Sequence, residues 1–257
     1  MWRFDVGDPS TSNWTGKILF KSNPGNDSST GRKIFYPPDV TFENSYQFLF
    51  FGTGDREHPV SSMTIVDRLY AVKDYSVSGF TTEGTSEGSC PTSATPASAS
   101  NQLTDVTCDD LQTGNSVQAS AMSAALSTSG GWYIRLTNTG EKDLSPATVI
   151  NQVATLTTFA PLSSSSAKTC TANLGTAYVY SLSYTNGNSV FNYNQDNSTT
   201  AADRSTKIGT DGIPSGVVVT IVPGKTTGLV GIGGGIINVQ VPNASSANQI
   251  YWHEPYY

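Results

Sequence analysis

The chain has 257 residues, of which only 13% are charged, and its formal net charge is −6. An average soluble domain has about 25% charged residues, so we expect a polar, weakly charged surface of the kind found on secreted and cell-surface β proteins. The negative balance excludes the basic patch that would attract a nucleic acid or an anionic membrane. No stretch is apolar for long enough to insert directly into a membrane.

Short runs of β-branched and aromatic residues, separated by turn sequences, predict strands along nearly the whole chain. In chain order they are residues 2–6, 16–22, 46–54, 67–75, 131–138, 147–161, 177–184, 216–222, 236–241 and 249–257. Only residues 116–127 suggest a helical turn, and their serine content makes that signal weak. The predicted fold class is all-β.

The arrangement of these strands favours stacked antiparallel sheets. Residues 48–51 are apolar on both faces, whereas residues 132–136 mix apolar and polar positions. A strand buried on both faces beside half-buried strands is typical of a β-propeller, so we predict a partial or modified propeller with long loop insertions. Residues 1–257 form one all-β domain or a propeller fragment, and residues 80–130 form a long Ser/Thr-rich insertion.

Three cysteines are present, an odd number. Cys90 and Cys108 flank a Ser/Thr/Ala-rich segment and are predicted to close it as a disulfide, which would stabilise the fold by about 3 kcal/mol. Cys170 would then be unpaired, or its partner would lie outside this chain. The two histidines and the lack of a CxxC pair argue against a zinc site.

Residues 192–203, "NYNQDNSTTAAD", have the spacing of an EF-hand-type calcium loop. The oxygen ligands would come from Asn192, Asn194, Asp196, the Ser198 carbonyl and Asp203. Asn197 replaces the usual glycine and would adopt the left-handed backbone of that position. With only two carboxylates, the loop is either a weak or degenerate Ca²⁺ site or a polar loop held by Asx-turns.

Two further motifs have a structural interpretation beside a functional one. Asp55, Glu57 and His58 lie within "GTGDREHP" and are either a carboxylate–histidine acid/base group or solvated charges in a turn. The glycine run at 228–236 resembles a phosphate-binding loop, but predicted strands flank it on both sides, so a bend or bulge is favoured.

Several phrases resemble, in collinear order, the C-terminal propeller domain of the type IV pilus-associated adhesins of the PilY family. They are "MWRFDV" at 1–6, "PDVTFENSYQFLFFGTGDREHP" at 38–59, "DRLYAVKDYS" at 67–76, "GWYIRLTNTGEKDLSPATVINQVATLTTFAP" at 131–161, "CTANLGTAYVYSLSYTNGNSVF" at 170–191 and "GIPSGVVV" at 212–219. The resemblance covers residues 1–76 and 131–257. It begins inside a propeller blade, so the first blades would come from elsewhere.

The resemblance implies a non-enzymatic, extracellular pilus tip adhesin or assembly factor. Such a protein would bind minor pilins or an N-terminal companion chain, and would present loops to a surface or host ligand. It also implies an aspartate-rich Ca²⁺ loop in the propeller. The alternatives are a structural subunit that completes a propeller with another chain by strand pairing, and a secreted propeller enzyme. The first residues lack a signal peptide, so we expect either a cytosolic protein or the tail of a longer precursor, and favour the tail.

Overall fold

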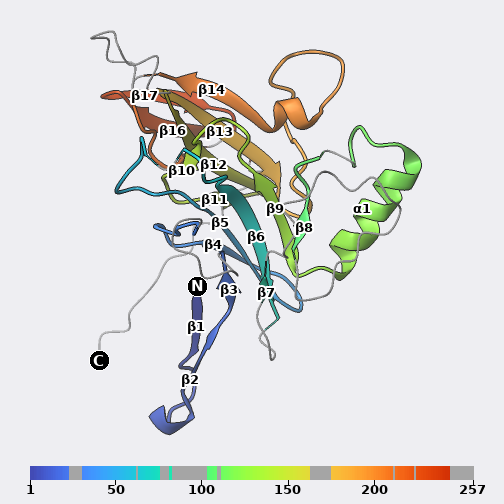
Figure 1. The fold of residues 1–257 in the computed structure, drawn as a ribbon, viewed down its shortest axis with the longest axis vertical. Helices are drawn as coiled ribbons and strands as arrows, with labels where there is room; N and C mark the ends of the chain where they lie inside the picture. Colours follow the sequence, from blue (N-terminus) through green and yellow to red (C-terminus); the bar gives the residue numbers. More distant parts are fainter. Residues whose placement is uncertain are drawn as a thin grey trace.

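A computed structural model describes most of the chain (Figure 1). The described residues are 1–22, 31–61, 63–75, 81–82, 103–108, 111–162, 175–210, 212–222 and 224–243, with residues 81–82 described by their backbone alone. The predicted last strand at 249–257 lies outside them.

Strands dominate the described structure, at 42% against 10% helix, so the all-β class is confirmed. The strands are β1 (Trp2–Asp5), β2 (Thr15–Ile18), β3 (Phe20–Lys21), β4 (Asp39–Phe42), β5 (Gln47–Gly52), β6 (Arg68–Asp74), β7 (Thr81–Thr82), β8 (Thr104–Asp105), β9 (Gly131–Arg135), β10 (Lys142–Asp143), β11 (Thr148–Ile150), β12 (Val153–Pro161), β13 (Gly175–Ser183), β14 (Ser205–Gly209), β15 (Val218–Val222), β16 (Lys225–Ile232) and β17 (Gly235–Val239). The helices are η1 (Thr11–Asn13), α1 (Ser116–Thr128) and η2 (Ala201–Arg204).

Three larger sheets hold most of these strands. The first has the order β4-β5-β6-β9-β8, the second β10-β12-β13-β14 with β11 also paired to β12, and the third β15-β16-β17. Neighbouring strands are antiparallel except for β8 with β9 and, in a small separate sheet, β3 with β7. The smaller sheets are β1-β2 and β3-β7. Among the described residues the sheets close no barrel, and the propeller stays a prediction.

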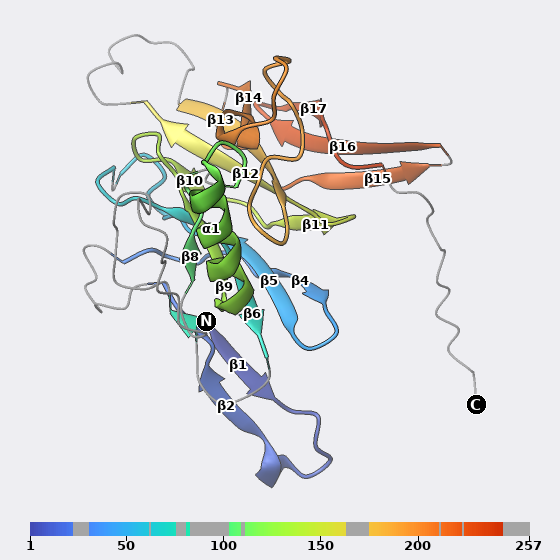
Figure 2. The ribbon, with the colours of Figure 1, turned by 90° about the vertical axis from the view of Figure 1, so that its right-hand side faces the viewer.

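The larger sheets stack through their apolar faces (Figure 2). Phe50 and Trp132 from the first sheet pack with Leu156 and Leu182 from the second. Val179, on the other face of the second sheet, packs with valines of the third. Phe51 and Tyr70, on the far face of the first sheet, pack with Phe20 of β3. The first and second sheets are therefore apolar on both faces, as the stacked arrangement requires.

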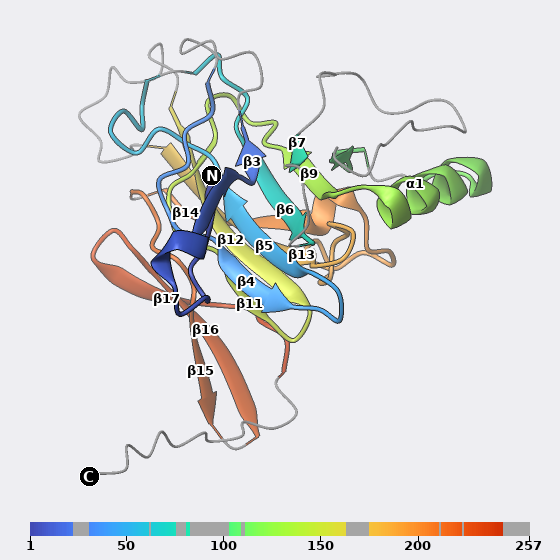
Figure 3. The same ribbon diagram turned by 90° about the horizontal axis from the view of Figure 1, so that it is seen from below.

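The helix α1 is longer than its sequence suggests and lies to one side of the stacked sheets (Figure 3). The Asn115 side chain accepts from the amides of Val117 and Gln118, while the Gln118 side chain accepts from the Asn115 amide. This capping box satisfies the first free amides of the helix, and burial of Ala121 and Met122 anchors it. Within the described residues, no helix has the length and hydropathy to cross a bilayer.

A second departure concerns residues 147–161, predicted as one strand. They form the hairpin β11–β12, which turns at Asn151 and Gln152. Both turn residues have positive φ, 45° and 66°, as a tight two-residue hairpin turn requires. The glycine run at 228–236 is also a hairpin, because β16 passes through Gly228 and turns before β17. The bend is confirmed only at Gly233 and Gly234, which both have positive φ, whereas most of the run belongs to β16, a strand that the sequence did not predict.

Candidate functional site

The predicted calcium loop connects the bridge that follows β13 to η2. Its last ligand, Asp203, is the third residue of η2 and is fully buried. One carboxylate oxygen accepts from the amides of Tyr193 and Asn194, each at 3.0 Å, and the other from the Thr200 amide at 3.0 Å. The hydrogen bond from Thr200 is the largest cause that lowers the pKa of Asp203. The loop's own backbone thus holds this carboxylate ionised.

The remaining predicted ligands also bond within the loop. Asn194 Oδ1 accepts from the Asp196 amide at 3.0 Å, and Asp196 Oδ1 accepts from the Ser198 amide at 2.7 Å. Asn192 Nδ2 donates to the Asp196 carbonyl oxygen at 2.6 Å. These are the Asx-turns that the sequence left open as an alternative. Calcium binding stays a prediction: oxygens of Asn194, Asp196 and Asp203 accept from loop amides, whereas Asn192 Oδ1 is buried without a hydrogen-bond partner among the described residues.

One detail of the calcium prediction is wrong. The left-handed residue of the loop is Gln195, with φ 59°, and not Asn197. The sharp turn therefore comes two residues earlier than in an EF-hand loop. The Asx-turn at Asn194, which closes around Gln195, accounts for this position.

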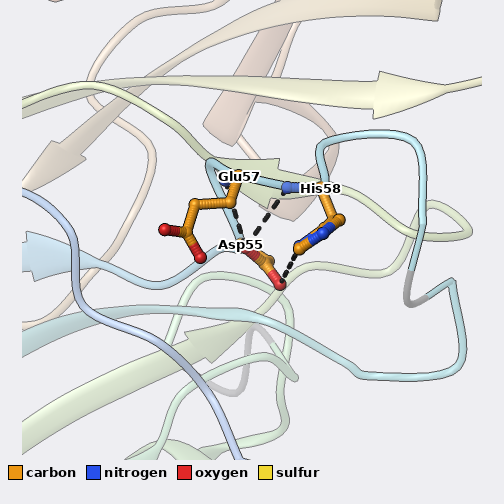
Figure 4. Close-up of side chains that lie close together, drawn as sticks. All are labelled: Asp55, Glu57 and His58. Atoms are coloured by element: carbon orange, nitrogen blue, oxygen red, sulfur yellow. Dashed lines mark hydrogen bonds and ion pairs between the residues drawn. The ribbon is translucent and has the colours of Figure 1, made fainter.

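Asp55, Glu57 and His58 form the one group of three possible metal ligands among the described residues, with ligand atoms within 4.8 Å of one another. Figure 4 shows Asp55 between the Glu57 carboxylate and the His58 ring. Asp55 Oδ1 accepts from the amides of Glu57 and His58, at 3.1 and 3.3 Å. Asp55 Oδ2 accepts from Lys33 Nζ at 2.7 Å and lies 3.4 Å from His58 Nδ1.

This geometry gives the cluster a structural use. Burial raises the pKa of Asp55, but the Lys33 ammonium and the His58 amide outweigh burial, and the net pKa lies below its usual value. A divalent ion would have to displace the Lys33 ammonium from Asp55. The His58 and Glu57 side chains are 62% and 67% exposed, so solvent surrounds both of them. We assign the cluster no catalytic role.

A buried polar junction, which sequence reasoning missed, lies beside this cluster. We define it by Thr53, Asp67, Lys142 and Asp143, which are all buried. The Asp143 amide donates to the Thr53 carbonyl oxygen at 2.9 Å, which joins β10 to the loop after β5. Lys142 Nζ donates to the Gly140 carbonyl oxygen at 2.8 Å. The sequence "GEKD" looks like a solvated turn, and nothing in it signals burial.

Burial dominates the electrostatics of this polar junction. It raises the pKa of Asp67 to about 6 and the pKa of Asp143 well above its usual value. It lowers the pKa of Lys142, although Asp67 and Asp55 favour the charged ammonium. Charged groups lose hydration here and regain only part of that energy from one another.

Replacing Asp67 with asparagine is expected to stabilise the fold by about 2 kcal/mol at pH 8 and to change little at pH 4. As the pH rises, the unfolded chain releases this proton near pH 3.8 and the folded chain near 6, so wild-type stability falls across that window and stays lower above it. Loss of the charge near Lys142 offsets part of the gain. Urea midpoints at pH 4, 6 and 8 measure the effect, with the exposed Asp8→Asn as a control. An equal gain in stability at every pH would contradict the raised pKa of Asp67.

Another buried carboxylate belongs to Glu141. Its Oε1 accepts from the Tyr180 hydroxyl at 3.0 Å and from the Thr158 hydroxyl at 2.5 Å, and its Oε2 accepts from the Asn138 amide group at 2.7 Å. Burial raises the pKa of Glu141, and these hydrogen bonds lower it only in part. The arrangement ties β12 and β13 to the turn before β10, so it holds the second sheet in place.

Cys108 is bonded in a disulfide. The predicted partner Cys90 lies outside the described residues, as does Cys170, so the Cys90–Cys108 pairing stays a prediction. Near Cys108, Arg204 donates to the carbonyl oxygens of Val106 and Thr107, at 2.6 and 2.8 Å.

Comparisons with known protein families, with curated proteins and with solved structures find no match to this chain.

Proposed function

We propose that this chain is a non-enzymatic type IV pilus tip-associated adhesin or assembly factor, located outside the cell, that binds minor pilins and presents loops to surfaces. The observation that carries the proposal is a contact between two of the segments that resemble the PilY family. The end of "FGTG" and the turn "GEKD" lie far apart in the sequence, yet they interlock at the buried polar junction. Their contact supports the interpretation that both segments belong to the fold of that family.

A second support is a braced, weakly charged surface beside α1. The Gln112 side chain donates to the Ser189 and Thr199 carbonyl oxygens, at 3.4 and 3.1 Å, and accepts from the Ser189 amide at 3.1 Å. Arg204 fixes the neighbouring turn, and α1 itself contains no charged residue. Figure 1 places α1 and the loop before η2 on the same side. Loops held on a rigid β scaffold are suited to recognition.

The proposal is tested by measuring binding of the purified chain to purified minor pilins by biolayer interferometry. We expect saturable binding to at least one minor pilin, with a dissociation constant on the order of micromolar. Gln112→Ala, which removes the brace, should weaken binding, whereas the exposed Lys225→Ala on the third sheet should not. Binding to none of the pilins of the source genome would overturn the proposal.

A structural subunit that pairs its strands with another chain is the second candidate function. It is supported by the hairpin of β1 and β2, which exposes large apolar side chains. The enzyme alternative depended on Asp55, Glu57 and His58 sharing a pocket. They lie together, but Asp55 is held in its ion pair with Lys33, so we do not propose that alternative.

A further inference from the structure

The hairpin of β1 and β2 has one apolar and one charged face. Along β1, Trp2 and Phe4 alternate with Arg3 and Asp5, so the two pairs point to opposite sides. In the antiparallel register Trp2 lies opposite Ile18, and opposite residues share a face. Phe4 lies opposite Gly16, and a β-carbon on Gly16 would come within 2.9 Å of the Phe4 ring. The ring therefore lies across the glycine and forms a flat apolar surface.

The hairpin turns this apolar face to solvent. Trp2 is 60% exposed and Phe4 67% exposed, and their rings stack with centroids 6.4 Å apart. Val6 and Trp14, beyond the ends of the two strands, are exposed as well. On the charged face, Arg3 donates to Asp74 at the end of β6 at 2.8 Å. The hairpin therefore turns its charged face toward the rest of the protein and its apolar face toward solvent.

The position of the hairpin makes this face accessible. Figures 1 and 2 show β1 and β2 projecting away from the three stacked sheets. Within the described part of the chain, β1 and β2 pair with each other in a sheet of their own. A two-stranded sheet is marginally stable in water and gains stability when another layer covers its apolar face. A contiguous apolar patch of this kind marks an interaction site.

We propose that the apolar face of this hairpin packs against the same face of a second copy of the chain, related by a two-fold axis. This inference goes beyond the second candidate function, because the two chains would pack face to face and would not pair their strand edges. The face carries no charged side chain, because Arg3, Asp5 and Lys17 all lie on the other side. A chain of net charge −6 can therefore bring two copies of this surface together without opposing like charges across the contact.

The area of the contact fits a weak dimer. At 150 to 250 Å² for each aromatic side chain, the exposed parts of Trp2, Phe4, Val6 and Trp14 amount to roughly 500 Å² per copy. Two copies would bury about 1,000 to 1,200 Å² with the surrounding backbone, at the lower end for specific interfaces. In a two-fold contact each substitution occurs on both copies, so a single change should weaken the dimer strongly.

Sedimentation velocity of the full chain from about 1 to 200 µM tests the inference. We expect a reversible dimer with a dissociation constant on the order of micromolar, which Phe4→Lys raises at least about tenfold. The matched control is Phe42→Lys on the edge strand β4, where Phe42 is 79% exposed. Both this control and Asp5→Lys on the charged face should leave the constant within about twofold. Circular dichroism melts establish that each variant is folded.

The following results would overturn the inference. A wild-type chain that stays monomeric throughout, or a Phe4→Lys variant that dimerises like wild type, overturns the inference. Loss of the dimer in Phe42→Lys or Asp5→Lys also overturns it, because the contact would then use an edge or the charged face. Pilin binding is measured on the monomeric Phe4→Lys variant, so failure of the adhesin proposal and failure of the dimer are distinguishable.

Discussion

Replacing Gly54 with alanine is expected to destabilise the fold by about 3 kcal/mol, because the site has no room for a methyl group. A β-carbon on Gly54 would lie 2.6 Å from the Asp143 carbonyl oxygen and 2.7 Å from the Lys142 β-carbon. Both atoms are fixed in β10, so the clash cannot be relieved by rotating a side chain. The loop and β10 would have to separate, which would strain the hydrogen bond between Asp143 and Thr53.

The measurement is the free energy of unfolding in urea, with Gly7→Ala as the control. Gly7 is exposed, and a β-carbon there meets no atom within 4 Å. Alanine at Gly7 should be neutral or slightly stabilising, because it restricts the unfolded chain. If both variants lost the same small amount of stability, the close approach of the two segments would be wrong, and with it the main structural support for the proposed function.

Many strands were predictable because they use local signals, but β4, β14 and β16 lie outside every predicted range. Runs such as residues 67–75 combine β-branched and aromatic residues, and β6 appears there as expected. The turn at Asn186 and Gly187 was also readable, and Gly187 has a φ of 71°. The helix α1 was underestimated because its serines obscured its start, although the Asn115 and Gln118 capping signal was present in the sequence.

The junction between the sheets could not be predicted in the same way. Lys142 and Asp143 form a two-residue strand in a polar stretch. Such a stretch has no alternation of apolar and polar residues that would indicate burial. Their burial results from long-range packing against the loop after β5. The outward face of β1 is a similar case, since alternation shows that Trp2 and Phe4 share a side but not which side faces the body. The ion pair of Arg3 with Asp74 decides that orientation.

Asp203→Ala should cost about 4 kcal/mol, because it leaves three backbone amides without their buried acceptor. These amides belong to Tyr193, Asn194 and Thr200. Asp203→Asn should destabilise the fold somewhat less. One oxygen remains as an acceptor, although the new amino group would face a backbone amide, which is itself a donor. In the wild type, the lowered pKa of Asp203 contributes stability that is fully present above the unfolded pKa of 3.8 and is lost as the pH falls from there through the lower folded pKa. Both variants should therefore differ least from wild type in acid.

The same variants decide between the two interpretations of the loop at 192–203. If Asx-turns hold the loop, the cost of Asp203→Ala will be equal in EDTA and in about 5 mM Ca²⁺, and wild-type stability will not depend on the ion. Asp196→Asn is the matched control, because it alters an exposed carboxylate that the calcium prediction also uses. It should cost little in either buffer.

A calcium site would give the opposite pattern. Ca²⁺ would stabilise the wild type by an amount that rises with the logarithm of its concentration above Kd, and Asp196→Asn would abolish that gain as fully as Asp203→Ala. An ion would also have to draw Asp203 away from the amides of Tyr193 and Asn194, at the start of the loop, and the Thr200 amide near its end. Those amides are what hold the loop closed around Gln195, so binding would have to rebuild the loop. For that reason we expect the ion-independent result.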